Sequence, residues 1–245
     1  MGHRVTTLNV NAIEPAGSTL TIGASGDTVV ATDSVNVNTV KDAGGNTLWV
    51  SNGSGTLSSV NSGFGGKLVL ISTQTASDTA SISFTSGIDS TYREYIFKFY
   101  TIRPATDAAE FSFQVNESGE TGYNETISST TFFADHAEDD TAAALQYTAT
   151  HDQGSGTSFQ PIAWDVGNGA DECCAGELRL FNPGSTSVFK NFYARLADYA
   201  NGLYMYDDFT AGIIGNSNAI TEIQFKFSTG NIADGKIMMY GVAIS

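Results

Sequence analysis

The sequence predicts an all-β protein in which a β-rich N-terminal arm precedes an antiparallel sandwich or barrel. Three observations support this prediction. Charged residues make up only 15% of the 245 residues, and Gly, Ser, Thr and Asn are abundant instead, which is typical of strands joined by turns. From residue 67 onward, apolar runs rich in aromatic residues alternate with turn formers. No apolar pattern with the helical repeat extends beyond a short stretch.

The first 66 residues contain only short strand candidates. Residues 19–22, 34–38 and 47–51 alternate aliphatic and polar side chains, and the turn-forming runs GASGD, DAGGN and SNGSG separate them. Burying an aliphatic side chain yields about 1.5–3 kcal/mol, whereas ordering each residue costs roughly 1–2 kcal/mol in backbone entropy. A lone copy is therefore unfavourable. We expect several copies, three by preference, to bury these side chains against one another; the alternative is disorder until a partner surface is met.

From Lys67 the strand candidates become longer and more aromatic. The run EYIFKFYTI is almost continuously apolar from Tyr95 to Ile102, as expected for a strand covered on both faces. Roughly eight to ten such strands joined by turns are typical of an antiparallel sandwich or barrel. The other candidates are residues 67–73, 80–84, 111–115, 177–181, 188–196, 222–227 and 236–245, and residues 137–147 (AEDDTAAALQY) are the best helix candidate.

Charge and cysteine usage exclude several classes of protein. The net charge of -15 and the eleven dispersed Lys and Arg residues argue against nucleic-acid binding, which requires a basic face, and against anionic membranes. The opening MGHRVTTLNV does not resemble a signal peptide, and no apolar run approaches the ~18 residues of a membrane span. Cys173 and Cys174 are adjacent, and we expect two free thiols, which suits folding in a reducing cytoplasm.

Six segments carry a resemblance to a known family. In chain order they are NTVKDAGGNTLWVSNGSGTLSSVNSGFGGKL, SISFTSGIDSTYREYIFKFYTIRPATD, FQVN, GELRLFNPGST, KNFYARL and GKIMMYGVAIS. They resemble fibre-like virion structural proteins of marine tailed bacteriophages, of the cyanophage and pelagiphage type, over about residues 35 to 245. The resemblance implies a phage appendage with a jelly-roll-like terminal domain, assembled as a homotrimer. It implies no catalytic residues.

The resemblance and the composition together predict a division into three parts. Residues 1–30 are expected to be a virion-anchoring arm, residues 31–66 a Gly/Ser/Asn-rich β-stalk, and residues 67–245 a jelly-roll-like head. We expect a non-enzymatic short tail fibre in the virion. Its N-terminus would dock on a tail adaptor, baseplate or capsid protein, and its head would contact a host cell-surface receptor, with a glycan as one class considered. The alternatives are a capsid decoration, cement or head-fibre protein and, less favoured, a polysaccharide depolymerase.

Motifs that would carry catalysis or hold a metal were not found in the sequence. His3, His136 and His151 form no HExxH pattern or close cluster, and we expect each to be a solvent or loop residue. The acidic run Asp135–Asp140 lacks the spacing of a calcium loop, so a solvated loop is favoured, although cation binding stays open. Neither GxSxG nor a phosphate-binding glycine loop is present. We therefore expect no cofactor, no metal site and no enzymatic activity.

The stretch DYANGLYMYDDFTAG offers the best binding candidates. Sugar sites combine flat apolar rings with planar hydrogen-bonding groups, and this stretch contains both. The alternative is that its rings make ordinary core or trimer contacts. The loops at residues 151–160 and 165–174 are further candidates for a receptor surface. The predicted glycan or receptor residues are Tyr199, Tyr204, Tyr206, Asp207 and Asp208.

Overall fold

The structure is a computed structural model that describes residues 37–54, 57–60, 68–200, 202–215 and 217–243. The chain divides into two compact units, residues 1–60 and residues 61–245, and each is described by itself. The described residues form fifteen strands and no helix, so the all-β prediction is confirmed. The candidate strand at residues 19–22 and the anchoring arm lie outside the described residues.

The first unit contains a small antiparallel sheet of three strands. Its strands are β1 (Thr39–Lys41), β2 (Thr47–Ser51) and β3 (Leu57–Val60), in the order β1-β2-β3. Trp49 of β2 pairs with Val40 on one side and Val60 on the other. Every residue of β2 is half-buried, and no side chain described in residues 37–60 is fully buried. The sheet thus encloses no core of its own, and burial between sister chains stays a prediction.

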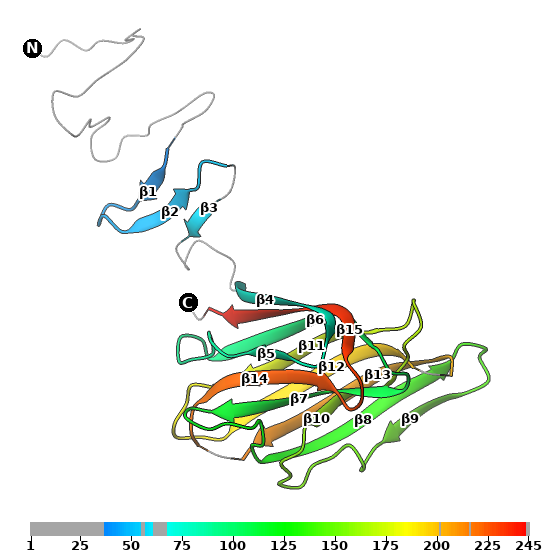
Figure 1. Ribbon diagram of the computed structural model, residues 1–245. Coiled ribbons are helices and arrows are strands. Elements are labelled where there is room, and N and C mark those ends of the chain that lie inside the picture. The colour runs from blue at the N-terminus through cyan, green and yellow to red at the C-terminus, as the bar shows by residue number, and fades with distance from the viewer. Residues whose placement is uncertain (1–36, 55–56, 61–67, 201, 216, 244–245) are drawn as a thin grey trace, which may run out of the picture. The chain divides into compact units, whose positions relative to one another are not determined.

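The second unit contains twelve strands. They are β4 (Leu68–Thr79), β5 (Ile82–Phe84), β6 (Glu94–Pro104), β7 (Ala109–Glu117), β8 (Ile127–Ala137), β9 (Ala143–Tyr147), β10 (Gln160–Val166), β11 (Cys174–Phe181), β12 (Lys190–Ala200), β13 (Tyr204–Ile214), β14 (Ile220–Phe227) and β15 (Ile232–Val242) (Figure 1). All of their pairings are antiparallel.

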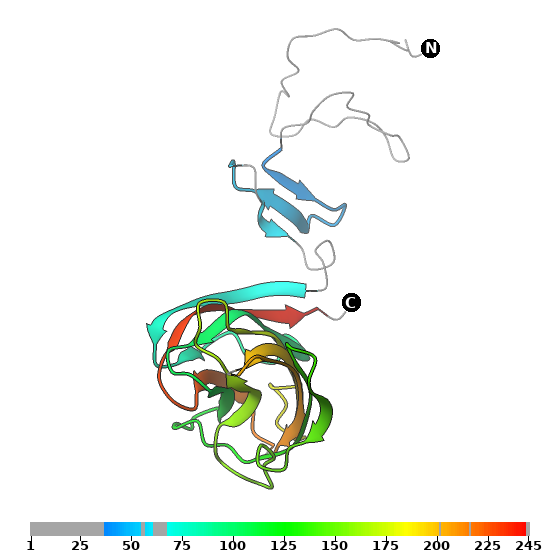
Figure 2. The ribbon, with the colours of Figure 1, turned by 90° about the vertical axis from the view of Figure 1, so that its right-hand side faces the viewer.

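Eight of these strands form a jelly-roll-like sandwich. One sheet has the order β4-β15-β6-β11, and the other has the order β5-β14-β7-β10. This is the double Greek-key arrangement of a jelly roll, so the predicted jelly-roll-like antiparallel sandwich is confirmed. The strands curl around a common interior (Figure 2). The two layers join along one side, where Val166 at the end of β10 pairs with Ala200 at the end of β12.

Two inserted hairpins widen the first sheet. Strands β12 and β13 follow β11 in the chain, strands β8 and β9 follow β7, and together they extend the sheet in the order β11-β12-β13-β8-β9. The hairpin β12-β13 is long and regular, with eleven residue pairs from Lys190 opposite Ile214 to Ala200 opposite Tyr204. The result is one broad sheet of eight strands packed on a narrow sheet of four.

Phenylalanine rings fill the space between the sheets. Phe225 of β14 is fully buried and lies within 5.2–6.4 Å, between ring centroids, of four other rings from both layers. Two of these four contacts, with Phe84 and Phe99, are edge-to-face, which is a favoured geometry for aromatic pairs. The four rings belong to Phe84, Phe97, Phe99 and Phe111. The core therefore depends on alternate residues of β6, β7 and β14 pointing into one interior.

Loops cover the outer face of the narrow sheet. The side chain of Gln114, on the outer face of β7, has no exposed surface. Its amide nitrogen donates hydrogen bonds to the main-chain oxygens of Glu125, Thr157 and Ser158, at 2.9, 3.3 and 3.0 Å. Three carbonyls of two separate loops are thereby held by one amide. The broad sheet is the one whose outer side chains remain open to solvent.

The structure corrects the sequence analysis at several elements. Residues 137–147 do not form a helix, because residues 143–147 pair as β9 with β8. All five residues of β9 are exposed. Its Ala and Leu residues favour a helix by composition, but they lie in a strand. Strands β8, β9, β10 and β13 were not predicted as strands. Their Pro, Asp, Ala and Gly residues weaken the strand pattern, and pairing with neighbours stabilises them instead.

The ring cluster makes Phe225 a sensitive position. We expect Phe225→Ala to lower the free energy of unfolding by about 3–5 kcal/mol, because it leaves a cavity among four rings. The matched control is Phe189→Ala, since Phe189 is 51% exposed; it should change stability by no more than about 0.5 kcal/mol. Urea unfolding followed by fluorescence measures both variants. Equal effects at the two positions would contradict the described core.

Candidate functional site

The outer face of the broad sheet carries a continuous row of large side chains. Because strand residues alternate between faces, one residue from each of seven successive strands points outward at the same level. Moving from β15 to β9, the row begins with an apolar residue, continues through three charged residues and ends in three rings. In register order the row is Met238, Lys98, Glu177, Arg195, Phe209, Phe132 and Tyr147.

The middle of the row is held in place by stacking and ion pairing. The guanidinium of Arg195 donates two hydrogen bonds to Asp207, at 2.9 and 2.8 Å, which is the bidentate geometry that fixes an arginine. Its carbon lies 4.7 Å from the centroid of the Phe209 ring, within cation–π range. The ring of Phe132 stacks on Phe209 at 4.9 Å with 5° between the planes. These exposed groups are consequently ordered before any ligand arrives.

A hollow of about 690 Å³ lies beside this row. Tyr100 of β6 lines one side, Tyr193 of β12 and Phe209 lie on the other side, and Ala175 and Gly176 of β11 form the floor between them. A β-carbon at Gly176 would lie 2.2 Å from the carbonyl oxygen of residue 195. Close approach of β12 therefore requires glycine here, and the floor carries no side chain larger than the methyl group of Ala175.

A β-bulge exposes Tyr100. Between Phe99 and Ile102, β6 has two residues opposite the single Ala175 of β11. Thr101 has a φ of 52°, in the left-handed region that β-branched residues rarely adopt. As a result, Tyr100 and Thr101 are both exposed, although strict alternation would bury one of them. Such strained bulges are concentrated at binding and active sites.

Two further hollows extend this one across the sheet. The first, about 760 Å³, lies on the other side of Tyr100 and reaches residues of β15 and β4. The second, about 170 Å³, shares Tyr193 and Phe209 with the central hollow and reaches Phe132 of β8. Because each hollow shares a lining ring with the next, together they form one groove that crosses seven strands, here called the outer groove. The rings of Tyr240, Tyr100, Tyr193, Phe209 and Phe132 line it from one end to the other.

The five predicted binding residues do not share one face. Tyr199 and Asp207 point outward from β12 and β13, where the Tyr199 hydroxyl donates to Glu138 at 2.8 Å and Asp207 pairs with Arg195. Tyr204, Tyr206 and Asp208 point to the opposite, inner side of β13. Asp208 is only 2% exposed. Because side chains alternate along the strand, the five predicted residues lie on two faces. Of these five, Asp207 alone is connected to the outer groove, by its ion pair with Arg195.

The inner side of β12 and β13 holds a buried pair of carboxyl groups. Asp198 and Asp208 are 4% and 2% exposed, and neither Asp198 oxygen has a hydrogen-bond partner among the described residues. Burial, followed by repulsion from Asp208, raises the pKa of Asp198 to about 10. Burial also raises the pKa of Asp208, which accepts a hydrogen bond from the Trp164 main chain at 3.3 Å. Burial and the neighbouring carboxylate therefore favour the protonated form of Asp198 at neutral pH.

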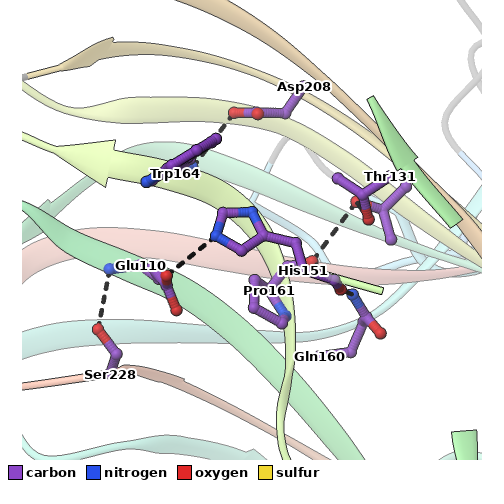
Figure 3. Close-up of polar contacts among 9 residues, drawn as sticks. Glu110, Thr131, His151, Gln160, Pro161, Trp164, Asp208 and Ser228 are labelled. Atoms are coloured by element: carbon purple, nitrogen blue, oxygen red, sulfur yellow. Dashed lines mark hydrogen bonds and ion pairs between the residues drawn. The ribbon is translucent and has the colours of Figure 1, made fainter. Parts of the chain in front are cut away.

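Next to this pair, His151 fastens the loop of residues 148–159 to the core. Its Nε2 lies 3.0 Å from the Glu110 carboxylate, and its ring lies 4.3 Å from the Trp164 ring (Figure 3). The Gln160 amide donates to the His151 carbonyl at 2.9 Å. His151 lies in a loop, which is one of the two expected settings, but it is only 6% exposed. Glu110 and Gln160 thus anchor this loop, which is one of the loops predicted to contribute to a receptor surface.

Other sequence features have local structural roles. Asp135 lies on β8 and Asp139 and Asp140 in the following turn, where the Asp140 carboxylate lies 3.3 Å from His136. Among residues with described positions, no three His, Cys, Asp or Glu side chains lie close enough to hold a metal ion. Cys173 and Cys174 are free thiols, as expected, with Cys174 buried at the start of β11. The described part of the chain contains no helix able to span a membrane.

The sequence pattern did not predict that Tyr100, Tyr193, Phe132 and Tyr147 would be surface residues. Residues 95–102 were expected to be covered on both faces, yet Tyr100 is 44% exposed. A usable signal did exist in β12, where Phe192 and Tyr193 are neighbours and must face opposite sides. Which of the two faces solvent depends on the partner strands, and those are distant in the chain.

Comparison of the chain with protein-family models, with curated proteins and with solved structures gives no match.

The raised pKa of Asp198 has a measurable consequence. An unfolded aspartate has a pKa of about 3.9, so between pH 4 and 10 the folded state binds a proton that the unfolded state lacks. The free energy of unfolding should fall as pH rises through this window, by at most about 1.4 kcal/mol per pH unit. We expect Asp198→Asn to flatten this fall between pH 5 and 9 in urea titrations.

Asp139→Asn is the control for that experiment. Hydrogen bonds from Thr141 lower the pKa of Asp139, so this carboxyl is ionised in both states above pH 5 and its removal should leave the slope unchanged. If Asp198→Asn retained the wild-type slope, Asp198 would be ionised in the folded protein.

Proposed function

We propose that this chain is a non-enzymatic attachment protein of a tailed-phage particle, a short fibre whose head contacts the host surface. The observation that carries the proposal is the outer groove. It lies on the open face of the broad sheet, while loops anchored by Gln114 cover the face of the narrow sheet. The segments that resemble marine phage virion proteins support the assignment to a phage particle. The outer groove supports the role in host contact.

The exposure of apolar side chains on one face supports a contact surface. Tyr100, Tyr193 and Phe132 are 44%, 41% and 41% exposed, and Leu70 of β4 is 50% exposed. Single exposed apolar residues are normal, but a contiguous set marks an interaction site. Aromatic residues are also enriched where proteins bind partners. The face of the broad sheet is accordingly the part of the head that we assign to the host surface.

The proposed trimer adds to this function through avidity. The half-buried strand β2 and the absence of a buried core among the described residues 37–60 favour assembly with sister chains. Three heads on one stalk present three grooves to the same cell. A second binding event then becomes intramolecular, which raises overall affinity without any new contact.

A specific observation also favours a second candidate, a capsid decoration or head-fibre protein. Strand β9 is an edge strand without a charged residue, and its Leu145 and Tyr147 are 74% and 65% exposed. Exposed apolar edges are sites of pairing with another chain. On a capsid, such an edge could join neighbouring subunits of the shell.

The position of the protein in purified particles separates the two candidates. For a fibre we expect a small number of copies at the tail, measured by quantitative mass spectrometry and by electron-microscopy reconstruction with a labelled chain. Copies distributed over the whole shell would instead support the decoration protein. A chain found in infected cells but not in particles would contradict both.

A further inference from the structure

We propose that the outer groove binds a linear acidic polysaccharide, one whose sugar units carry carboxylate or sulfate groups. This inference rests on the proposed function, because it names the ligand class for the same face. Three properties of the groove lead to it: its length, the spacing of its rings, and the distribution of its charges.

The length of the groove fits a polymer. Its hollows extend from Thr75 and Ala76 on β4 to Phe132 on β8, crossing seven strands. Neighbouring strands lie 4.7–4.9 Å apart, so six spacings amount to about 29 Å. A single sugar would occupy only a small part of this distance. An extended chain of several sugar units matches both the length and the open ends.

The rings of the groove suit the flat faces of sugars. Tyr100 lies between the two larger hollows, and Tyr193 and Phe209 lie between the central hollow and the smallest one. Pyranose rings have apolar faces and polar edges, and aromatic rings provide a matching apolar surface at little cost in side-chain entropy. Planar polar groups for the sugar hydroxyls stand beside them, on Glu177 and Arg195.

The charges of the groove select an acidic sugar. Each of its two lining carboxylates is paired with an arginine outside the lining, and one of these arginines, Arg179, also pairs with Glu94 at 2.8 Å. Glu177 accepts a hydrogen bond from Arg179 at 2.7 Å, and Asp234 accepts one from Arg103 at 3.0 Å.

Two lysines of the groove remain available for a ligand. Lys98 and Lys236 flank Tyr100 on neighbouring strands and form no hydrogen bond or ion pair with any described residue. They are the groups that an anionic ligand would meet. Lys98 lines the central hollow and Lys236 lines the larger hollow on the other side of Tyr100.

The acidic character of the whole chain does not oppose this selection. The net charge is -15, which would repel a polyanion if charge acted over the full molecule. At physiological salt, however, exposed charges are screened beyond about 8 Å. Local lysines within the groove therefore decide which ligand is favoured once the polymer is in contact.

The experiment is calorimetric titration of the full chain at 0.15 M salt with polyuronate oligomers (alginate or polygalacturonate), a sulfated galactan oligomer and a neutral glucan oligomer of equal length. We expect at least one acidic oligomer to bind about tenfold more tightly than the neutral one.

Tyr100→Ala and Tyr193→Ala should each weaken binding about tenfold, as expected for a central contact residue. The double variant Lys98→Gln/Lys236→Gln should abolish the preference for the acidic oligomer and retain neutral binding.

Tyr147→Ala is the matched control. Tyr147 lies in the same outward row and is 65% exposed, but it lines none of the three hollows. Its removal should leave polysaccharide affinity unchanged. Light scattering of each variant shows whether the groove is instead a contact between copies of the chain.

Several outcomes would overturn the inference. These are no binding of any acidic oligomer at millimolar concentration, equal loss of affinity in the Tyr147 control, or a change of oligomeric state in Tyr100→Ala. Failure of the proposed function has a different signature. If the full chain competes with phage particles for host cells but binds no polysaccharide, the attachment role stands and the ligand class is wrong. If it binds polyuronate but is not part of any particle, the ligand class stands and the attachment role is wrong.

Discussion

The packing of phenylalanine rings between two unequal sheets is the constraint on which the rest of the head depends. Phe97 and Phe99 must point inward to meet Phe225, so the residues between and beside them must point outward. Lys98 and Tyr100 are therefore surface residues as a consequence of core packing. The bulge at Thr101 adds one local deviation, and this deviation widens the exposed area around Tyr100.

Much of the fold could be predicted because its core strands place large apolar residues, mostly rings, at every second position. Residues 95–102, 111–115 and 222–227 carry this pattern densely, and each lies in a strand of the sandwich. The strands of residues 127–137 and 160–166 could not be predicted in the same way. Their polar side chains are held by pairing and by hydrogen bonds, such as that from Ser129 to Gln160 at 2.6 Å, which depend on segments distant in the chain.

The candidate site was harder to predict than the fold. Sequence reasoning favoured rings that are close together in the chain, such as Tyr204 and Tyr206, but these lie on the inner side of β13. The groove instead combines Tyr100, Tyr193 and Phe209 from three strands brought together by the sheet order β6-β11-β12-β13. Composition could indicate which residue types bind a sugar, whereas only the register could indicate which of them share a face.

The hairpins that widen the sheet enter the chain between jelly-roll strands, one after β7 and the other after β11. Their outward side chains do not take part in the packing that stabilises the eight-stranded framework. Substitutions at Tyr193, Phe209 or Phe132 could consequently accumulate under selection while the scaffold stays unchanged. A lineage built on this architecture could diversify its outer face through the two inserted hairpins, and the packed interior would carry little trace of those changes.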